Sequence, residues 1–233
     1  MDISWNLWHG CHKKSEGCKN CYVYRRDKSI GKDSNIVYKT RSFNLPISKN
    51  KKGEYKYKTG TTFATCFSSD FFIEEADGWR KEALDIIKER SDCDFFLITK
   101  RPERILKVMN PKDYPNLAIA CTMENNKRFE ERIKTYLDID MEYHGIMIEP
   151  MLEEINLDKY DLSNVDQISI GGESGPNARV LDFNWVKKIH DYCKKNKIDF
   201  YFHQTGAKII VDNKLYNIPR NKQHSQAYKA FHD

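Results

Sequence analysis

Three cysteines near the start of the chain, Cys11, Cys18 and Cys21, have the residue type and the spacing of a metal-binding loop. They follow the pattern C-x6-C-x2-C, and the residues between them are mostly polar and include Gly17, which predicts a loop rather than a helix or a strand. Three thiolates can hold three irons of a 4Fe–4S cluster and leave the fourth iron open to a substrate or a cosubstrate. The spacing therefore favours an iron–sulfur site.

A zinc site and a metal-free loop remain open alternatives. Structural zinc needs a fourth ligand, and no second C-x2-C or H-x3-H pair follows downstream. His9 or His12 would complete the set, but both are so close to Cys11 in the sequence that a tetrahedral shell would be strained. The remaining cysteines are isolated in apolar segments, where we expect them to be small core residues: Cys66, Cys93, Cys121 and Cys193.

Polar residues follow the ends of most of the apolar segments farther along the chain. In βα barrels the active site forms at the carboxyl ends of the strands, so these residues would converge on one mouth together with the cysteine loop. Single polar residues also occur at strand ends because loops are hydrated, so the prediction depends on the whole set. The set is Asp70, Lys100, Thr122, Glu124, Glu149, Glu173 and Gln204.

Seven short apolar segments alternate with amphipathic segments. This alternation would place the strand-end residues at one edge of a sheet. Apolar strands separated by amphipathic helices indicate a parallel sheet covered by helices. The pattern predicts an α/β fold, a single domain over residues 1–233 built as a complete or partial TIM-type barrel with about seven parallel strands; a flat doubly wound sheet is the alternative. The domain carries a basic insertion at about 27–60 and a polar C-terminal tail at about 212–233. The expected strands are 3–8, 61–67, 95–99, 117–120, 145–148, 167–170 and 199–202.

The composition is that of a globular protein with a mildly basic surface. Of 233 residues, 39% are hydrophobic and 31% are charged, and the net charge of +5 permits a nucleic-acid partner without requiring one. No apolar run is long enough to span a bilayer, and the first residues lack the basic flank and apolar stretch of a signal peptide. We therefore expect no membrane association and a cytoplasmic location, where the cysteines are reduced or metal-bound rather than disulfide-paired.

Lysines and tyrosines are interleaved within the basic insertion. Basic side chains can hold a phosphate backbone while aromatic rings stack on bases, so this segment is a candidate contact for nucleic acid. The alternative is a solvated surface loop or hairpin. The residues concerned are Lys49, Lys51, Lys52, Tyr55, Lys56, Tyr57 and Lys58.

The cysteine loop resembles that of the radical S-adenosylmethionine (SAM) enzymes, with three residues more than their usual C-x3-C-x2-C spacing. Residues 6–22 are similar to a stretched form of the spore photoproduct lyase loop, N-P-Y-x-G-C…C…C-Y. Several separate blocks, spread over nearly the whole chain, resemble a family of phage-associated and bacterial three-Cys-motif proteins of unassigned function. These blocks are SSD at 68–70, LITK at 97–100, IEP at 148–150, GGESG at 171–175 and QTG at 204–206.

The resemblance implies a radical SAM enzyme. In such enzymes a 4Fe–4S cluster, here held by Cys11, Cys18 and Cys21, receives an electron from an external donor and cleaves SAM reductively to methionine and a 5′-deoxyadenosyl radical. The protein supplies binding, orientation and the exclusion of water.

The resemblance also implies roles for the residues at the strand ends. Ser68, Ser69 and Asp70 would bind the ammonium or the ribose of SAM, and Lys100 would pair with its carboxylate. Gly171 and Gly172 would let a bound group approach the backbone, and Glu173 would accept from an amine or a ribose hydroxyl. The further cofactor-binding candidates are Thr122, Glu124 and Glu149. The candidates for returning a hydrogen atom to the product are Cys121 and Tyr22, with Cys66 and Tyr24 beside them.

Repair or modification of a nucleic-acid base, as by a lyase of DNA photoproducts, is the favoured reaction. Such an enzyme reaches a base inside a duplex by flipping it into a pocket. The alternatives are a radical SAM enzyme acting on a small molecule or a partner protein, and a non-enzymatic metal-stapled module that binds nucleic acid. The length of the chain argues against the last alternative, because structural metals are needed most by small domains.

Overall fold

The computed structural model describes residues 3–232, and within this range each of seven strands pairs in parallel with at least one neighbour. The contacts divide the chain into two units. The first comprises Met1–Lys13, Val23–Cys121 and Asp138–Tyr143, and the second comprises Lys14–Tyr22, Thr122–Leu137 and His144–Asp233. The predicted α/β fold with about seven parallel strands is confirmed.

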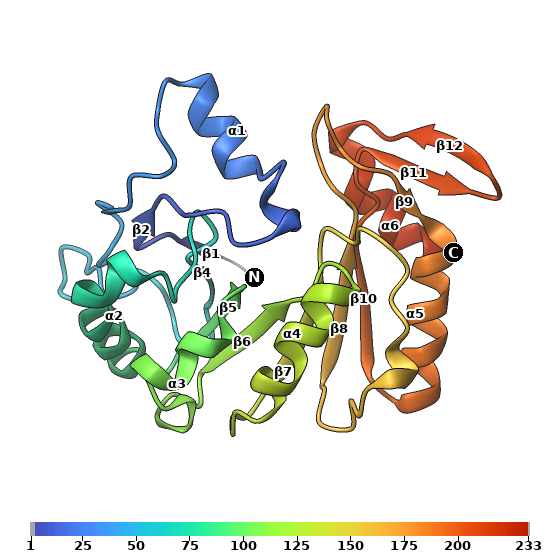
Figure 1. Cartoon of the computed structure of the whole chain (residues 1–233). Helices are drawn as coiled ribbons and strands as arrows, with labels where there is room; N and C mark the ends of the chain where they lie inside the picture. Colours follow the sequence, from blue (N-terminus) through green and yellow to red (C-terminus); the bar gives the residue numbers. More distant parts are fainter. Residues whose placement is uncertain (1–2, 233) are drawn as a thin grey trace. The chain divides into compact units, whose positions relative to one another are not determined.

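The first unit contains four of these strands in the order β1-β4-β5-β6 (Figure 1). They are β1 (Ile3–Trp5), β4 (Thr62–Thr65), β5 (Asp94–Thr99) and β6 (Leu117–Thr122). The rings of Phe63 and Phe95, partners in the β4–β5 register, stack with centroids 5.2 Å apart, and Trp5 meets Phe95 edge-on at 5.4 Å. Because such large apolar rings strongly favour burial, their pairing explains why these strands are neighbours.

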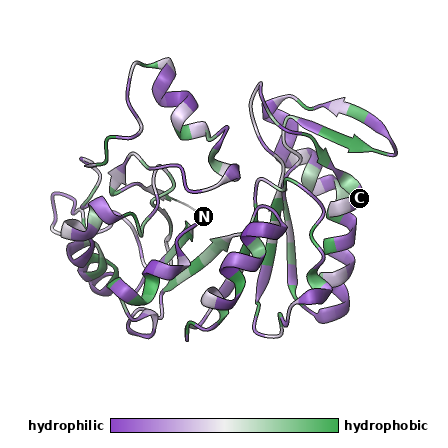
Figure 2. Ribbon diagram, viewed as in Figure 1, coloured by the Kyte–Doolittle hydropathy of each residue, from purple (hydrophilic) through white to green (hydrophobic). Residues whose placement is uncertain are grey.

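Helices and short 3-10 turns connect the strands of this unit. The helices are α1 (Tyr22–Ser29), α2 (Asp77–Glu89) and α3 (Ile105–Val108), and the turns are Glu74–Ala76, Pro102–Arg104 and Pro111–Asp113. Helix α2 buries Ala83, Ile86 and Ile87 at helical spacing, as the amphipathic pattern predicts. In Figure 2 its coil shows apolar and polar residues in alternation, whereas β6 is coloured as mostly apolar.

The first predicted strand, 3–8, is wrong in its extent. Strand β1 ends at Trp5, and Trp8–His9 forms a separate strand, β2, antiparallel to β3 (Tyr38–Lys39). The chain leaves the parallel sheet at Asn6 and Leu7, whose carbonyl groups accept from the Thr40 hydroxyl at 2.6 Å and from the Thr40 N–H at 2.8 Å. These hydrogen bonds replace those that a continuing parallel strand would make.

The second unit contains the other three parallel strands in the order β7-β8-β10. They are β7 (His144–Ile148), β8 (Gln167–Gly171) and β10 (Asp199–Gln204). A smaller sheet in the order β12-β11-β9 joins β9 (Leu181–Asp182), β11 (Lys208–Val211) and β12 (Lys214–Asn217). The helices of this unit are α4 (Asn126–Leu137), α5 (Phe183–Asn196) and α6 (Gln223–His232), and its 3-10 turns are Glu16–Cys18, Leu157–Lys159 and Arg220–Lys222.

The polar C-terminal tail is structured within this unit. Strand β12 and helix α6 account for most of residues 212–232, and α5 and α6 both contact β10. The Phe231 ring of α6 lies 5.1 Å from the ring of Phe200 and 5.7 Å from that of Phe183. An aromatic cluster therefore fixes the end of the chain on β10.

The complete barrel is wrong. Among residues 3–232, β1 pairs only with β4 and β10 pairs only with β8, so the order of strands has two free ends. The segment between β7 and β8 also lacks the helix that a regular βα repeat would place there, and holds only the 3-10 turn Leu157–Lys159. Finally, no helix of the described residues is long and apolar enough to cross a bilayer.

Candidate functional site

The cysteine loop is distributed over both units. Cys18 ends the 3-10 turn Glu16–Cys18, and the Cys21 N–H donates to the Cys18 carbonyl at 3.4 Å, so these two residues share one turn of the second unit. Cys11 belongs to the first unit, where its N–H donates to the Ser34 carbonyl at 2.7 Å. The preceding Gly10 has φ +93°, and a Cβ there would lie 2.2 Å from the Ile36 carbonyl oxygen, so only glycine fits.

The three cysteines of the loop differ from the other four in their exposure. Each of the three is partly accessible, whereas the other four are buried. Burial raises the pKa of the Cys193 thiol to about 12 and raises the pKa of Cys66 and Cys93 as well. A metal ligand must be a thiolate, so the buried cysteines are poor ligands and the prediction that they are core residues agrees with their burial.

The chemistry of the three loop thiols fits an iron–sulfur cluster, and their spacing in the sequence carries that prediction. Within residues 3–232 no group of three or more His, Cys, Asp or Glu side chains is gathered as a ready metal site, and this includes the three loop cysteines.

Glu124, a predicted cofactor ligand, holds the loop from the end of β6. Its carboxylate accepts from the Gly17 N–H at 3.0 Å and from the Ser15 hydroxyl, and Arg132 of α4 donates to it at 2.8 Å. The Glu124 side chain is fully buried and that of Arg132 is 6% exposed. A Cβ on Gly17 would lie 2.8 Å from Glu124 Oε1, so glycine is needed for this close approach.

Glu173 holds the same loop from the end of β8. It accepts from the Asn20 side chain at 2.8 Å and forms a two-pronged ion pair with Arg179, one contact being at 2.9 Å. Burial acts to raise the pKa of Glu173, but the hydrogen bonds from Arg179 and Asn20 outweigh it and lower the pKa. Two strand-end carboxylates of the second unit thus bind the segment that carries Cys18 and Cys21.

Glu149 and the two glycines lie together at the ends of β7 and β8. Glu149 contacts His203 Nδ1 at 2.7 Å and accepts from the Gln204 side chain. A Cβ on Gly171 would lie 2.4 Å from Glu149 Cδ, and one on Gly172 would lie 2.3 Å from the Thr205 carbonyl oxygen. The groups that approach Gly171 and Gly172 closely are therefore the Glu149 side chain and the Thr205 carbonyl, both of which belong to the protein.

Asp70 joins the ends of β4 and β5 in the first unit. Its two carboxylate oxygens accept from the Thr99 hydroxyl at 2.8 Å, from the Phe72 and Lys100 N–H groups at 3.0 Å each, and from Arg101 at 3.0 Å. Burial acts to lower the pKa of Arg101, but the Asp70 charge and hydrogen bond outweigh it and raise the pKa. Asp70 is 5% exposed, so its oxygens are occupied by the protein.

The other predicted residues have varied surroundings. The Ser68 and Ser69 hydroxyls donate to the carbonyls of Trp8 and Gly10, and the Thr122 carbonyl accepts from Arg132 at 2.6 Å. The Lys100 ammonium makes no hydrogen bond or ion pair with any residue in 3–232, which leaves it available to a ligand. Among the hydrogen-atom candidates, Cys121 is fully buried and Tyr22 is 43% exposed.

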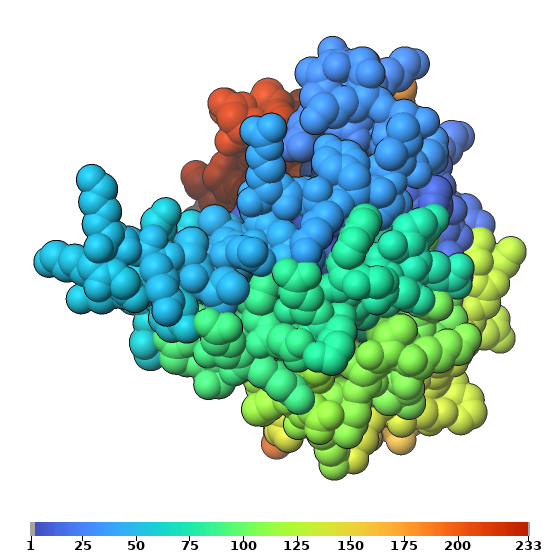
Figure 3. All heavy atoms as spheres, turned by 90° about the vertical axis from the view of Figure 1, so that its left-hand side faces the viewer, coloured from blue at the N-terminus to red at the C-terminus, as the bar shows by residue number. Residues whose placement is uncertain are grey.

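The tyrosines of the basic insertion are already engaged. The Tyr55 ring lies 4.3 Å from the Arg90 guanidinium, and its hydroxyl donates to Glu89 at 2.7 Å, while Tyr57 meets Phe63 edge-on. The five lysines are exposed, on a segment that projects from the first unit (light blue in Figure 3). The nucleic-acid prediction for this segment therefore rests on the lysines.

Sequence reasoning missed the arginine partners Arg101, Arg132 and Arg179. Arg101 stands beside the predicted Lys100 in the sequence, which is a usable signal. Arg132 lies eight residues after Glu124 on the buried side of an amphipathic helix, where an arginine needs an acidic partner.

Residues 1–228 match a family described as a protein of unknown function, DUF5131. The chain belongs to this family. The DUF5131 match spans both units and includes the cysteine loop and every strand-end residue named above. No curated protein and no solved structure shows a significant match to the chain.

Proposed function

We propose that the protein is a radical SAM enzyme in which Cys11, Cys18 and Cys21 hold a 4Fe–4S cluster, and that it repairs or modifies a nucleic-acid base. When bound, the cluster would supply the electron that cleaves SAM reductively. The proposal includes a partial rather than a complete barrel of seven parallel strands.

One observation carries the proposal. The only partly accessible cysteines among residues 3–232 are the three with the spacing of a cluster loop, and the other four are buried. A structural role would favour buried thiols, whereas ligation by thiolates needs groups that can ionise and reach an inorganic centre.

The chain's own residues would bind and orient the groups that react. Glu124 fixes the backbone before Cys18, Glu173 holds the side chain of Asn20 beside Cys21, and Lys100 offers an ammonium to the carboxylate of SAM. The Asp70 carboxylate accepts a hydrogen bond from the Lys100 N–H at 3.0 Å. Asp70 would therefore orient Lys100 rather than bind SAM itself. A base would be the substrate because the insertion exposes five lysines that can hold phosphates.

Incubation with SAM under anaerobic, reducing conditions tests the activity. The proposal predicts 5′-deoxyadenosine in stoichiometric or greater amounts from the wild-type protein and from Cys193→Ala, a matched control with a buried thiol removed. Cys18→Ala should yield none. An intact, reducible cluster that produces no 5′-deoxyadenosine from SAM would remove the enzymatic claim.

A further inference from the structure

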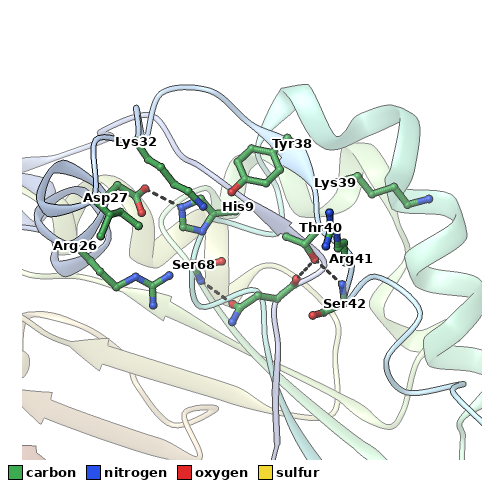
Figure 4. Close-up of a pocket in the computed structure, with 12 residues that line it drawn as sticks. His9, Arg26, Asp27, Lys32, Tyr38, Lys39, Thr40, Arg41, Ser42 and Ser68 are labelled. Carbon is green, nitrogen blue, oxygen red and sulfur yellow. Dashed lines mark hydrogen bonds and ion pairs between the residues drawn. The ribbon is translucent and has the colours of Figure 1, made fainter.

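A pocket of about 510 Å³ lies in the first unit, between α1, β2, β3 and the segment that follows β3. Figure 4 shows Arg26 and Asp27 of α1 on one side and Tyr38 and Arg41 on the other, with His9 between them. The volume is within the range of cavities that bind small organic ligands.

The pocket is strongly basic. Four of the side chains that line it are Arg26, Lys32, Lys39 and Arg41, whereas Asp27 is the one acidic residue in its lining. Lys39 is paired with Glu82 at 2.6 Å. The other three cations form no direct ion pair with any acidic group of residues 3–232, although the Arg26 charge acts on the Asp27 carboxylate. Cations without direct ion-pair partners around a concave surface attract anions.

The acidic residue of the lining is a buried carboxylate. Asp27 is 1% exposed, and its Oδ2 lies 2.7 Å from His9 Nε2 and accepts from the Ser34 hydroxyl at 2.6 Å. Asp27 Oδ1 has no hydrogen-bond partner among the described residues. Because burial shields this oxygen from the pocket, Asp27 holds His9 and Ser34 in place rather than contacting a ligand itself.

The cations and an aromatic side chain of the lining together favour one class of ligand. Arg26, Lys32 and Arg41 suit an anionic group such as a phosphate. Tyr38, 39% exposed, adds an aromatic face of the kind on which bases stack.

We infer that this pocket binds a phosphate-bearing nucleotide, with the phosphate against Arg26, Lys32 and Arg41 and the base against the ring of Tyr38. The nucleotide is either free or part of a single strand, and both present the same chemistry. The inference stands on the pocket alone and does not depend on a cluster or on SAM.

Equilibrium binding of two fluorescently labelled probes tests the inference, one a deoxynucleoside 5′-monophosphate and the other a single-stranded DNA decamer. The full-length protein should bind at least one of them, with affinity that falls as salt rises and with competition by inorganic phosphate. Binding of the decamer alone would assign the source as a strand, and binding of the monophosphate as a free nucleotide. Arg26→Gln with Arg41→Gln should weaken binding by about tenfold or more, since each removes a charge-assisted contact.

A matched control removes the same charge elsewhere. Lys107→Gln with Lys127→Gln neutralises two exposed lysines outside the pocket and should leave affinity within about twofold. The Arg26 and Arg41 side chains are exposed, so unfolding does not confound the pocket variant, and its thermal midpoint should match that of the control. No binding of either probe at low salt would overturn the inference, and so would equal loss of affinity in the two double variants.

Discussion

The carboxylate of Glu124 accepts a hydrogen bond at 3.0 Å from the N–H of Gly17, the residue immediately before Cys18, across 107 positions of the sequence. The same carboxylate is paired with the buried Arg132. A residue at the end of β6 therefore controls the backbone of the cysteine loop. Glu124 would thereby position Cys18, a proposed cluster ligand.

Glu124→Ala should destabilise the protein by about 3–5 kcal/mol, because it leaves the Arg132 charge buried without its partner. Urea unfolding measures the change, and hydrogen exchange at the Gly17 amide should accelerate beyond what the global loss explains. Glu131→Gln is the matched control, since Glu131 is 45% exposed and pairs with Arg128 on the same helix. The control should cost less than about 1 kcal/mol. Equal effects of the two substitutions would contradict the positioning role.

Asp70→Asn should cost about 3 kcal/mol, because Arg101 would lose its charge partner in a buried network. Chemical denaturation monitored by tryptophan fluorescence is the measurement. Asp85→Asn, which disturbs only the exposed pair with Lys81, should change stability by less than about 0.5 kcal/mol. A neutral effect of Asp70→Asn would show that its hydrogen bonds to Thr99, Lys100 and Arg101 do not hold the end of β5.

The second unit could be predicted from the sequence better than its contacts could. Apolar runs such as Ile146–Ile148 identify buried parallel strands, and Trp185, Ile189 and Cys193 mark a later helix, because periodicity depends only on local order. Glu173 has two partners, Arg179 and Asn20. Arg179 is near in sequence, but the contact with Asn20 could not be predicted because Asn20 lies 153 positions away. Long-range hydrogen bonds leave no periodic signal.

The candidate site was predictable in its residue types but not in their roles. Sequence position identified Asp70 and Glu124 as strand-end polar residues, and both are there. The ion pairs of Asp70 with Arg101 and of Glu124 with Arg132 could not be predicted, because an acidic residue has the same sequence pattern whether it faces a ligand or a buried arginine. The early end of β1 was missed for a similar reason. Thr40, which donates hydrogen bonds to the carbonyl groups of Asn6 and Leu7, lies in an irregular segment without a periodic pattern.

His203 should titrate above its ordinary pKa of 6.5. Burial acts to lower the pKa, but the hydrogen bond and charge of Glu149 outweigh it and raise the pKa. A raised folded-state pKa means that the pair stabilises the protein fully below about pH 6.5 and loses this contribution as pH rises through the folded-state value. NMR titration of the His203 ring measures the shift, and Glu149→Gln should reduce it. Titration at or below 6.5 in the wild-type protein would contradict the pairing.

Lys100→Gln should weaken SAM binding by about tenfold without changing stability, since its ammonium has no partner among the described residues and would lose only a contact to the carboxylate of SAM. Isothermal titration calorimetry of the reconstituted protein measures the affinity. Lys107→Gln, an exposed lysine on α3, is the control and should bind SAM as the wild type does. Unchanged affinity in Lys100→Gln would exclude this residue as a SAM ligand.

The iron and acid-labile sulfide content after anaerobic reconstitution tests the central claim most directly. The account predicts about four irons and about four sulfides per chain for the wild-type protein and for Cys193→Ala, with loss of the cluster signal in Cys11→Ala, Cys18→Ala and Cys21→Ala. About one zinc per chain without iron would contradict it, and so would iron content that is unchanged when any of the three loop cysteines is removed.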